Sequence, residues 1–185
     1  MERALVELAQ HGDEEAFASL ARMAGDRLMA VAFRILRDVD RAEDAVQQTI
    51  VAAWQDLPTL RDPDRFAGWL YRILVHACYA ELRRERRWTD TVRVLPDTPI
   101  ARDDFLSVDD RDQLERAFRR LPPDQRAVFA FHHYLGMRLP EIAEILEIPL
   151  GTAKSRLHYA TALLRAAIDA DARPTRSDAT GERSA

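Results

Sequence analysis

The 185-residue chain lacks several features that mark particular classes of protein. It has one cysteine, Cys78, so no disulfide can form within the chain, and no cysteine–histidine group has the spacing of zinc ligands. We find neither a secretory signal at the N-terminus nor an apolar run long enough to cross a bilayer. We therefore expect a soluble, cytoplasmic protein that binds no metal and does not insert into a membrane.

The chain also lacks an excess of positive charge and any arrangement of residues typical of catalysis. Its formal net charge at pH 7 is −4, so affinity for nucleic acid must come from local basic patches. His132 and His133 are adjacent, which predicts different sides of a helix, and no carboxylate at ligand spacing accompanies them. We interpret both as packing or surface residues. No glycine-rich phosphate-binding loop is present, so we expect neither an enzyme nor a bound cofactor.

What the sequence does contain, throughout its first half, is helical periodicity, and no segment alternates as a strand would. We expect a helix over about 3–10, a second capped by Asp13, a third capped by Asp38 or Asp40, and a fourth over about 65–87. Cys78 lies within an apolar series, so we predict that it is a small core residue. The buried side of the fourth helix is predicted to comprise Phe66, either Trp69 or Leu70, Ile73, Ala77 and Ala80. Four helices that each carry one apolar face can bury these faces against one another as a bundle.

The composition changes after the fourth helix. Residues 89–107 are rich in aspartate and hold Pro96 and Pro99 without a sustained period, which is typical of a solvated linker. A second helical unit follows, in which Pro123 suits the first turn of a helix and Gly136 suits a helix end. We therefore predict an all-α fold of two small helical domains joined by a flexible acidic linker. The predicted segments are an N-terminal bundle (1–88), the linker (89–107), a C-terminal helix-turn-helix domain (108–170) and a disordered tail (171–185).

The helix-turn-helix prediction rests on residues 139–160. Ile142, Ala143 and Leu146 mark the inner face of a first helix, and Pro149 with Gly151 marks the turn. We expect Thr152 to cap the second helix. The inward positions of that helix are predicted to be Ala153, Leu157, Ala160 and Leu164. Lys154, Ser155, Arg156, His158 and Tyr159 then remain outside, and a helix with such groups near its N-terminus fits the DNA major groove.

A basic cluster ends the fourth helix of the first half. It consists of Arg83, Arg84, Arg86 and Arg87, with Arg72 upstream. Aromatic residues are interleaved with it, namely Trp69, Tyr71, Tyr79 and Trp88. Cations attract phosphates, and flat rings can stack on unpaired bases. We expect the arginines to bind DNA, whereas the rings suit core packing and base stacking equally well.

Several motifs in this order resemble those of a known family. The stretch 121–126 (LPPDQR), Glu141-Ile-Ala143 and Gly151-Thr-Ala-Lys-Ser-Arg-Leu157 resemble region 4 of sigma factors. Ala42-Glu-Asp-Ala-Val-Gln-Gln-Thr49 resembles region 2.2, and the stretches 66–73 and 82–87 resemble regions 2.3 and 2.4. Nothing resembles regions 1.1 or 3. The chain therefore resembles the extracytoplasmic function (ECF) group of the sigma-70 family over about residues 16–168.

This resemblance implies a dissociable subunit that binds core RNA polymerase, recognises two promoter elements and promotes promoter melting. It assigns the −35 element to Thr152, Lys154, Ser155, Arg156, His158 and Tyr159. It assigns the −10 element to Arg61, Arg65, Trp69, Arg72, Arg83, Arg84, Arg86 and Arg87, with a base flipped into a pocket by the loop 57–65. It assigns docking on the β′ clamp helices to Glu43, Asp44, Gln47 and Gln48. The resemblance further implies the β flap, promoter DNA and an anti-sigma factor as partners, and a linker that threads toward the polymerase cleft.

Three positions depart from the family pattern, all in the second domain. Arg138 stands where serine or threonine is frequent, Glu147 where glycine is common, and Tyr159 where arginine is frequent. Another class of function also fits a helix-turn-helix, namely a stand-alone dimeric transcription regulator whose N-terminal bundle dimerises or senses a signal. A pure interaction module is a third class, and the intact basic cluster argues against it.

Overall fold

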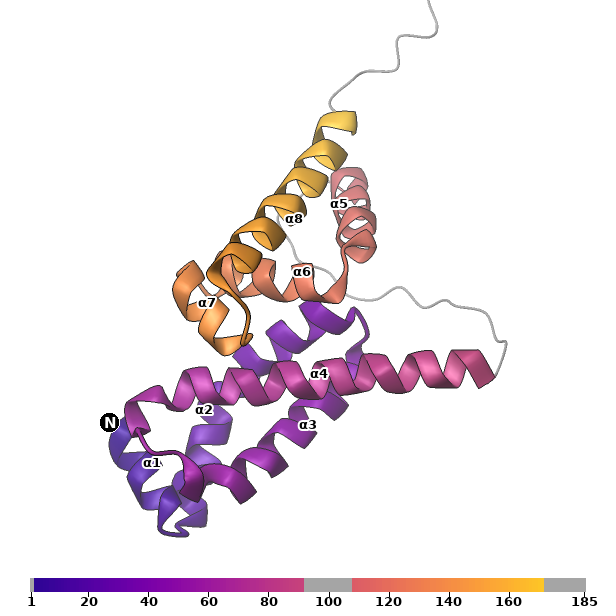
Figure 1. Ribbon diagram of the computed structural model, residues 1–185. Helices are drawn as coiled ribbons and strands as arrows, with labels where there is room; N and C mark the ends of the chain where they lie inside the picture. Colours follow the sequence, from indigo (N-terminus) through magenta and orange to yellow (C-terminus); the bar gives the residue numbers. More distant parts are fainter. Residues whose placement is uncertain (1, 92–107, 172–185) are drawn as a thin grey trace, which may run out of the picture.

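The computed structural model describes residues 2–91 and 108–171, and this part of the chain is helical with no β-strand (Figure 1). The predicted all-α class is confirmed. The predicted linker, except its first three residues, and the tail beyond Asp171 lie outside the described residues.

The N-terminal unit consists of four helices in the predicted order. They are α1 (Glu2–Gln10), α2 (Glu14–Leu36), α3 (Val39–Asp56) and α4 (Phe66–Thr91), with the 3-10 turns η1 (Leu57–Thr59) and η2 (Pro63–Arg65) before α4. The Asp13 side chain accepts a hydrogen bond from the Ala16 amide at 2.9 Å and caps α2 as predicted. Of the two aspartates considered for α3, Asp38 is the cap, because its Oδ1 accepts from the Arg41 amide at 3.0 Å.

The buried side of α4 differs from the prediction. Ile73, Ala77 and Ala80 are only partly buried, and Leu70 is the more buried of the Trp69–Leu70 pair. The helix buries one i, i+4 row and a second row beside it, which comprise Phe66, Leu70, Leu74 and Cys78 together with Tyr71 and Val75. The second row is buried because α4 packs against the C-terminal unit as well as against its own bundle. Local periodicity describes only one of these two contacts.

The C-terminal unit is built around a long last helix. Its elements are α5 (Val108–Arg120), α6 (Pro123–Phe129), the π-turn η3 (Ala130–Tyr134), α7 (Leu139–Ile145) and α8 (Leu150–Asp171). Pro123 opens α6 as predicted, and Gly136 takes a positive φ of 67° just after the π-turn. Figure 1 shows α5 beside the far half of α8, with α6 and α7 beside the near half.

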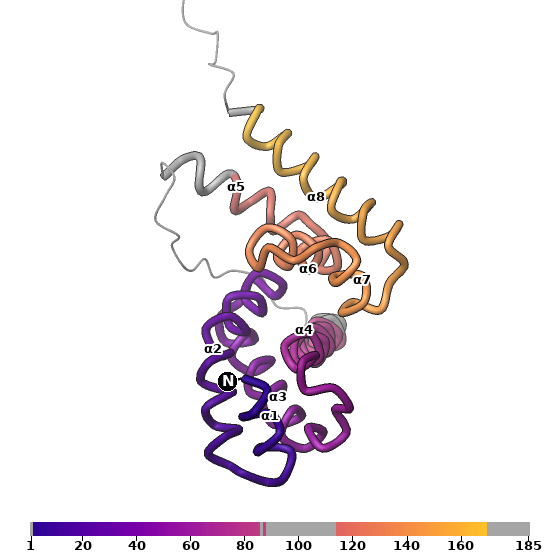
Figure 2. Tube along the Cα trace, turned by 90° about the vertical axis from the view of Figure 1, so that its left-hand side faces the viewer, coloured from indigo at the N-terminus to yellow at the C-terminus, as the bar shows by residue number. Residues whose placement is uncertain are grey.

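The two units share one apolar core. Phe131 and Ile142 of the C-terminal unit are fully buried in the same cluster as Ile35 and Leu74 of the N-terminal unit. The rings of Tyr71 and Phe131 meet edge to face at 5.5 Å. Figures 1 and 2 show α6 and α7 lying against α2 and α4. The two units therefore pack against each other. The predicted flexible linker between two domains gave no indication of this contact.

Candidate nucleic-acid interface

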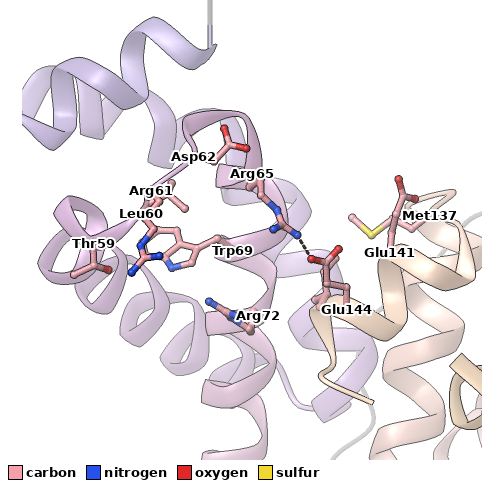
Figure 3. A pocket seen from close by; sticks show the side chains of 12 residues that line it. Thr59, Leu60, Arg61, Asp62, Arg65, Trp69, Arg72, Met137, Glu141 and Glu144 are labelled. Carbon is pink, nitrogen blue, oxygen red and sulfur yellow. Dashed lines mark hydrogen bonds and ion pairs between the residues drawn. The ribbon is translucent and has the colours of Figure 1, made fainter. Parts of the chain in front are cut away.

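Four of the residues predicted to contact a −10 element lie around one cavity. Arg61, Arg65, Trp69 and Arg72 line a space of about 530 Å³ at the start of α4 (Figure 3). The segment before α4 carries Arg61 and, in η2, Arg65, and the first turns of α4 carry Trp69 and Arg72. The rest of the lining comes from Thr59, Leu60, Asp62 and Gly68 and, across the unit boundary, from Met137, Glu141, Glu144 and Ile145.

The Trp69 ring lies between the core and the cavity. It packs half-buried against the core, with its ring centroid 6.0 Å from that of the buried Phe66. Its remaining surface lines the cavity, with Arg61, Arg65 and Arg72 around it in Figure 3. A flat ring beside three guanidinium groups can stack on a base while the cations hold the adjoining phosphates. Phe66, by contrast, is a core residue.

The basic cluster continues along α4 away from this cavity. Arg83, Arg84 and Arg87 are exposed, and Arg84 pairs with Glu81 at 3.4 Å. Arg86 belongs to α4, but its side chain and that of Trp88 lie outside the described residues. Three exposed guanidinium groups on one helix give the local positive charge that an acidic chain needs to hold DNA.

Two of the aromatic residues interleaved with this cluster contact the core. Tyr71 is 8% exposed, and burial raises the pKa of its phenol above the usual range. Burial also raises the pKa of Tyr79 to about 12, with a smaller effect in the same direction from Asp124. The Tyr71 ring is therefore a core residue, and the Tyr79 ring is partly buried against the core.

The outer face of α3 carries the residues predicted to bind core polymerase. Glu43, Asp44, Gln47 and Gln48 are all exposed. Gln48 Nε2 donates to Glu81 Oε1 of α4 at 2.7 Å, and Glu81 is only 6% exposed. Because Glu81 also accepts from Arg84, this contact fixes the polar face of α3 beside the basic end of α4. Sequence reasoning missed Glu81, whose position on the buried side of α4 was the available signal.

Two of the family departures, Arg138 and Glu147, lie just beyond the two ends of α7. Glu147 takes φ 53°, a left-handed conformation that a glycine adopts without strain. The Ile148 amide then donates to the Ala143 carbonyl at 3.0 Å, which closes the end of α7. At the other end of α7, the Arg138 amide donates to Glu141 Oε2 at 2.9 Å. This contact lowers the pKa of Glu141, and it supplies part of the cap that a serine would give.

Thr152 does not cap α8, which corrects the prediction. The helix begins at Leu150, and the amides of Thr152 and Ala153 both donate to the Pro149 carbonyl, at 2.9 and 3.1 Å. The helix starts directly after the proline, so Thr152 already lies within the first turn. The inward positions Ala153, Ala160 and Leu164 are buried as predicted, and Leu157 is partly buried.

The outer face of α8 carries most of the predicted −35 residues. Lys154, Ser155, His158 and Tyr159 are exposed, with Tyr159 at 63%. Thr152 and Arg156 are only partly exposed, and Arg156 Nε lies 2.9 Å from Asp124 Oδ2 in the first turn of α6. Sequence reasoning missed Asp124, although an acid in the first turn of a helix is a common partner for a nearby cation.

Burial also shifts the pKa of a thiol and of a guanidinium group in the described part of the chain. Burial raises the pKa of the Cys78 thiol to about 12 and lowers that of Arg126 to about 10. His132 is partly buried, and its Nδ1 lies 3.0 Å from the Met137 carbonyl oxygen. His133 is exposed, with its ring 4.4 Å from that of Phe129, so the pair fits the predicted packing or surface positions. The two imidazole rings are 4.9 Å apart and do not diverge, because the helix widens into the π-turn here.

Over residues 2–91 and 108–171, no three histidine, cysteine or acidic side chains gather as a metal site would require. None of the helices in these ranges combines the length and apolar character of a membrane span.

Known proteins with this organisation are sigma factors. Residues 20–88 match the family "Sigma-70 region 2", and residues 111–164 match "Sigma-70, region 4". The chain is 34% identical over 163 residues to the ECF RNA polymerase sigma factor SigL of Mycobacterium tuberculosis, covering 83% of this chain and 92% of SigL. It is 25% identical over 173 residues to the ECF RNA polymerase sigma factor SigW of Bacillus subtilis, covering 86% of this chain and 92% of SigW.

Two solved structures share the arrangement of both units. One is the sigma factor RpoE in complex with the anti-sigma factor NepR from Bartonella quintana, with a TM-score of 0.73, 25% identity, and coverage of 84% of this chain and 98% of RpoE. The other is CnrH in complex with the cytosolic domain of CnrY, with a TM-score of 0.66, 29% identity, and coverage of 92% and 98%.

Proposed function

The chain belongs to the ECF group of the sigma-70 family, and we propose that it directs core RNA polymerase to promoters through two DNA-reading surfaces on separate helical units. The chain is a transcription initiation factor. It brings no catalytic residues of its own, and the polymerase carries out RNA synthesis. Such a factor acts in the cytoplasm, where the polymerase and the promoters are.

The first surface is the face of α4 with the turn before it, and it takes the −10 element. Arg61, Arg65 and Arg72 surround Trp69 at the cavity, and Arg83, Arg84 and Arg87 extend the positive charge along the same helix. A cavity with a ring and cations suits an unpaired base whose neighbouring phosphates are held outside. Stacking and ion pairing there offset the cost of unstacking the base, which promotes melting.

The second surface is the exposed side of α8, and it takes the −35 element. Lys154, Ser155, His158 and Tyr159 point away from the core near the start of the helix. Such a helix reads base edges in the major groove while its short polar groups hold phosphates. Thr152 and Arg156 contribute from the border of this surface, where Arg156 is paired with Asp124.

The polymerase surface is the outer face of α3. Glu43, Asp44, Gln47 and Gln48 form an exposed set of acids and amides suited to a basic partner helix such as the β′ clamp helices. The C-terminal unit docks on the β flap. Holding both units on one large enzyme fixes the separation of the two DNA-reading surfaces, so each gains from the binding of the other. An anti-sigma factor that occupies these surfaces completes the set of partners.

The observation that carries the proposal is the pair of exposed cationic helix faces, on α4 and α8, within a sigma-70 chain. In vitro run-off transcription with core polymerase over a genomic promoter library tests it. We expect the chain to confer start sites that core enzyme alone does not use. A chain that neither associates with core polymerase nor changes its start sites would refute the proposal. The stand-alone regulator, which family membership disfavours, would instead elute as a dimer and bind a palindrome without polymerase.

A further inference from the structure

Two of the arginines assigned to the −10 surface are already engaged by acids of the other unit. Arg65 Nη2 forms an ion pair with Glu144 Oε1, and Arg72 Nη1 lies 3.3 Å from Glu147 Oε1. Glu144 lies on α7 and Glu147 in the turn that follows it, so both acids come from the helix-turn-helix. Figure 3 shows the Arg65–Glu144 contact at the edge of the cavity.

The same part of the helix-turn-helix closes the cavity sterically. Ile145 is 8% exposed, and its Cγ1 lies 3.8 Å from the position that a Cβ on Gly68 would take. Met137 and Glu141 complete this wall. A nucleic-acid strand therefore meets a protein wall on one side of the cavity, and meets carboxylates where its phosphates would pair with Arg65 and Arg72.

The backbone at Glu147 supports a role for its carboxylate. The residue takes φ 53°, which costs free energy for any side chain but glycine. A glycine there would relieve the strain and could not pair with Arg72. Strain of this kind persists when the rest of the structure holds it, and it gathers at switch regions. The carboxylate also lies 4.0 Å from His76 Nε2, so it faces the cationic side of α4.

From these contacts we propose that Glu144 and Glu147 act as an autoinhibitory latch, which occupies Arg65 and Arg72 in place of DNA phosphates while the chain is free of polymerase. The inference rests on the proposed function of the α4 surface. The four side chains are 43–63% exposed, so the ion pairs are weak enough to be released. The closed latch suppresses binding to single-stranded DNA before the chain joins core polymerase. Separation of the two units on the polymerase would then open the cavity.

The test is binding of the full chain to a fluorescent single-stranded oligonucleotide of mixed sequence, measured over a series of salt concentrations. The double variant Glu144→Gln/Glu147→Gln is expected to bind about threefold to tenfold more tightly at low salt than the natural chain, as two exposed ion pairs would give. Its salt dependence should also steepen, because two more phosphates are neutralised.

A matched variant controls for net charge. Glu14 and Glu15 lie exposed in the first turn of α2 and line no part of the cavity. Glu14→Gln/Glu15→Gln therefore changes the net charge equally and should leave the affinity near that of the natural chain. If this control tightens binding as much as the latch variant does, a general charge effect explains the gain and the latch is overturned.

Two further outcomes separate failure of the latch from failure of the proposed function. Arg65→Ala/Arg72→Ala should weaken binding and remove the gain given by Glu144→Gln/Glu147→Gln. If the arginine variant weakens binding but the latch variant binds like the natural chain, the latch is wrong and the α4 surface stands. If the arginine variant has no effect, the assignment of this surface to DNA fails and the latch fails with it.

Discussion

Arg156 Nε of the recognition helix α8 lies 2.9 Å from Asp124 Oδ2 in the first turn of α6. The Arg156 side chain is 26% exposed, whereas its neighbours Lys154 and Ser155 face solvent. The ion pair ties the DNA-reading helix to the helix behind it. Arg156, which the family resemblance assigns to the −35 element, therefore also positions α8.

Replacing either partner of this ion pair should weaken DNA binding in a similar way. We expect Arg156→Ala and Asp124→Ala each to cost about 0.2–1 kcal/mol of unfolding free energy and to lower affinity for −35 DNA, since both release α8 from α6. Denaturant titration and holoenzyme–promoter binding measure the two quantities. If Arg156 instead reads a guanine, Arg156→Ala alone should cost about 1–3 kcal/mol of binding while Asp124→Ala leaves affinity intact.

Glycine at position 147 should stabilise the chain. The left-handed backbone at Glu147 is strained for a residue with a side chain, so Glu147→Gly is expected to raise the unfolding free energy by about 0.5–1 kcal/mol, after the entropy cost of glycine. Urea unfolding at fixed protein concentration checks this expectation. Glu147→Ala is the control, because it removes the Arg72 contact and keeps the strain. A gain with alanine equal to that with glycine would contradict the explanation.

The stability of the chain should fall at alkaline pH through Cys78. In the unfolded chain this thiol ionises near its ordinary pKa of 9.0, whereas burial holds the folded pKa at about 12. Between these values the unfolded state has lost a proton that the folded state retains, so stability decreases as pH rises, by up to about 1.4 kcal/mol per pH unit. Unfolding of the natural chain and of Cys78→Ala at pH 8 and pH 10.5 isolates this contribution. An equal loss in both would contradict it.

Glu81 should matter more than an ordinary acid of a helix surface. Its carboxylate accepts from Gln48 at 2.7 Å and from Arg84 at 3.4 Å while almost fully buried. We expect Glu81→Ala to cost about 1–3 kcal/mol of unfolding free energy, because Gln48 loses its partner and a buried gap remains. It should also weaken holoenzyme assembly, as the α3 face would lose its anchor on α4. Glu81→Gln, which keeps an acceptor, should restore most of both.

Local chemistry predicted those parts of the fold whose causes lie within a few residues. Asp13 caps α2 and Pro123 opens α6, since both effects depend on the first turn of the helix alone. The inward row Ala153, Ala160 and Leu164 follows from a helix packed on one side. The family resemblance likewise depends on local motifs, and the confirmed class and membership followed from them.

The parts that could not be predicted depend on contacts between distant segments. The second buried row of α4, with Tyr71 and Val75, exists because the other unit packs there. The family resemblance and the basic cluster point to Arg65 and Arg72, but their pairing with Glu144 and Glu147 joins residues 75 or more positions apart. The start of α8 was misplaced because both Pro149 and Thr152 suit a helix N-terminus, and only the backbone hydrogen bonds decide between them.

The most direct test of the account maps where the two helices touch a promoter. A DNA-cleaving chelate is attached at His76→Cys on α4 and, separately, at Leu150→Cys at the start of α8, both exposed positions, while the buried Cys78 stays unlabelled. In holoenzyme at a promoter found by run-off transcription, we expect cleavage near the −10 element from α4 and near the −35 element from α8, with none from Glu15→Cys on α2. Cleavage at one shared place from both helices, or at neither element, would contradict the account.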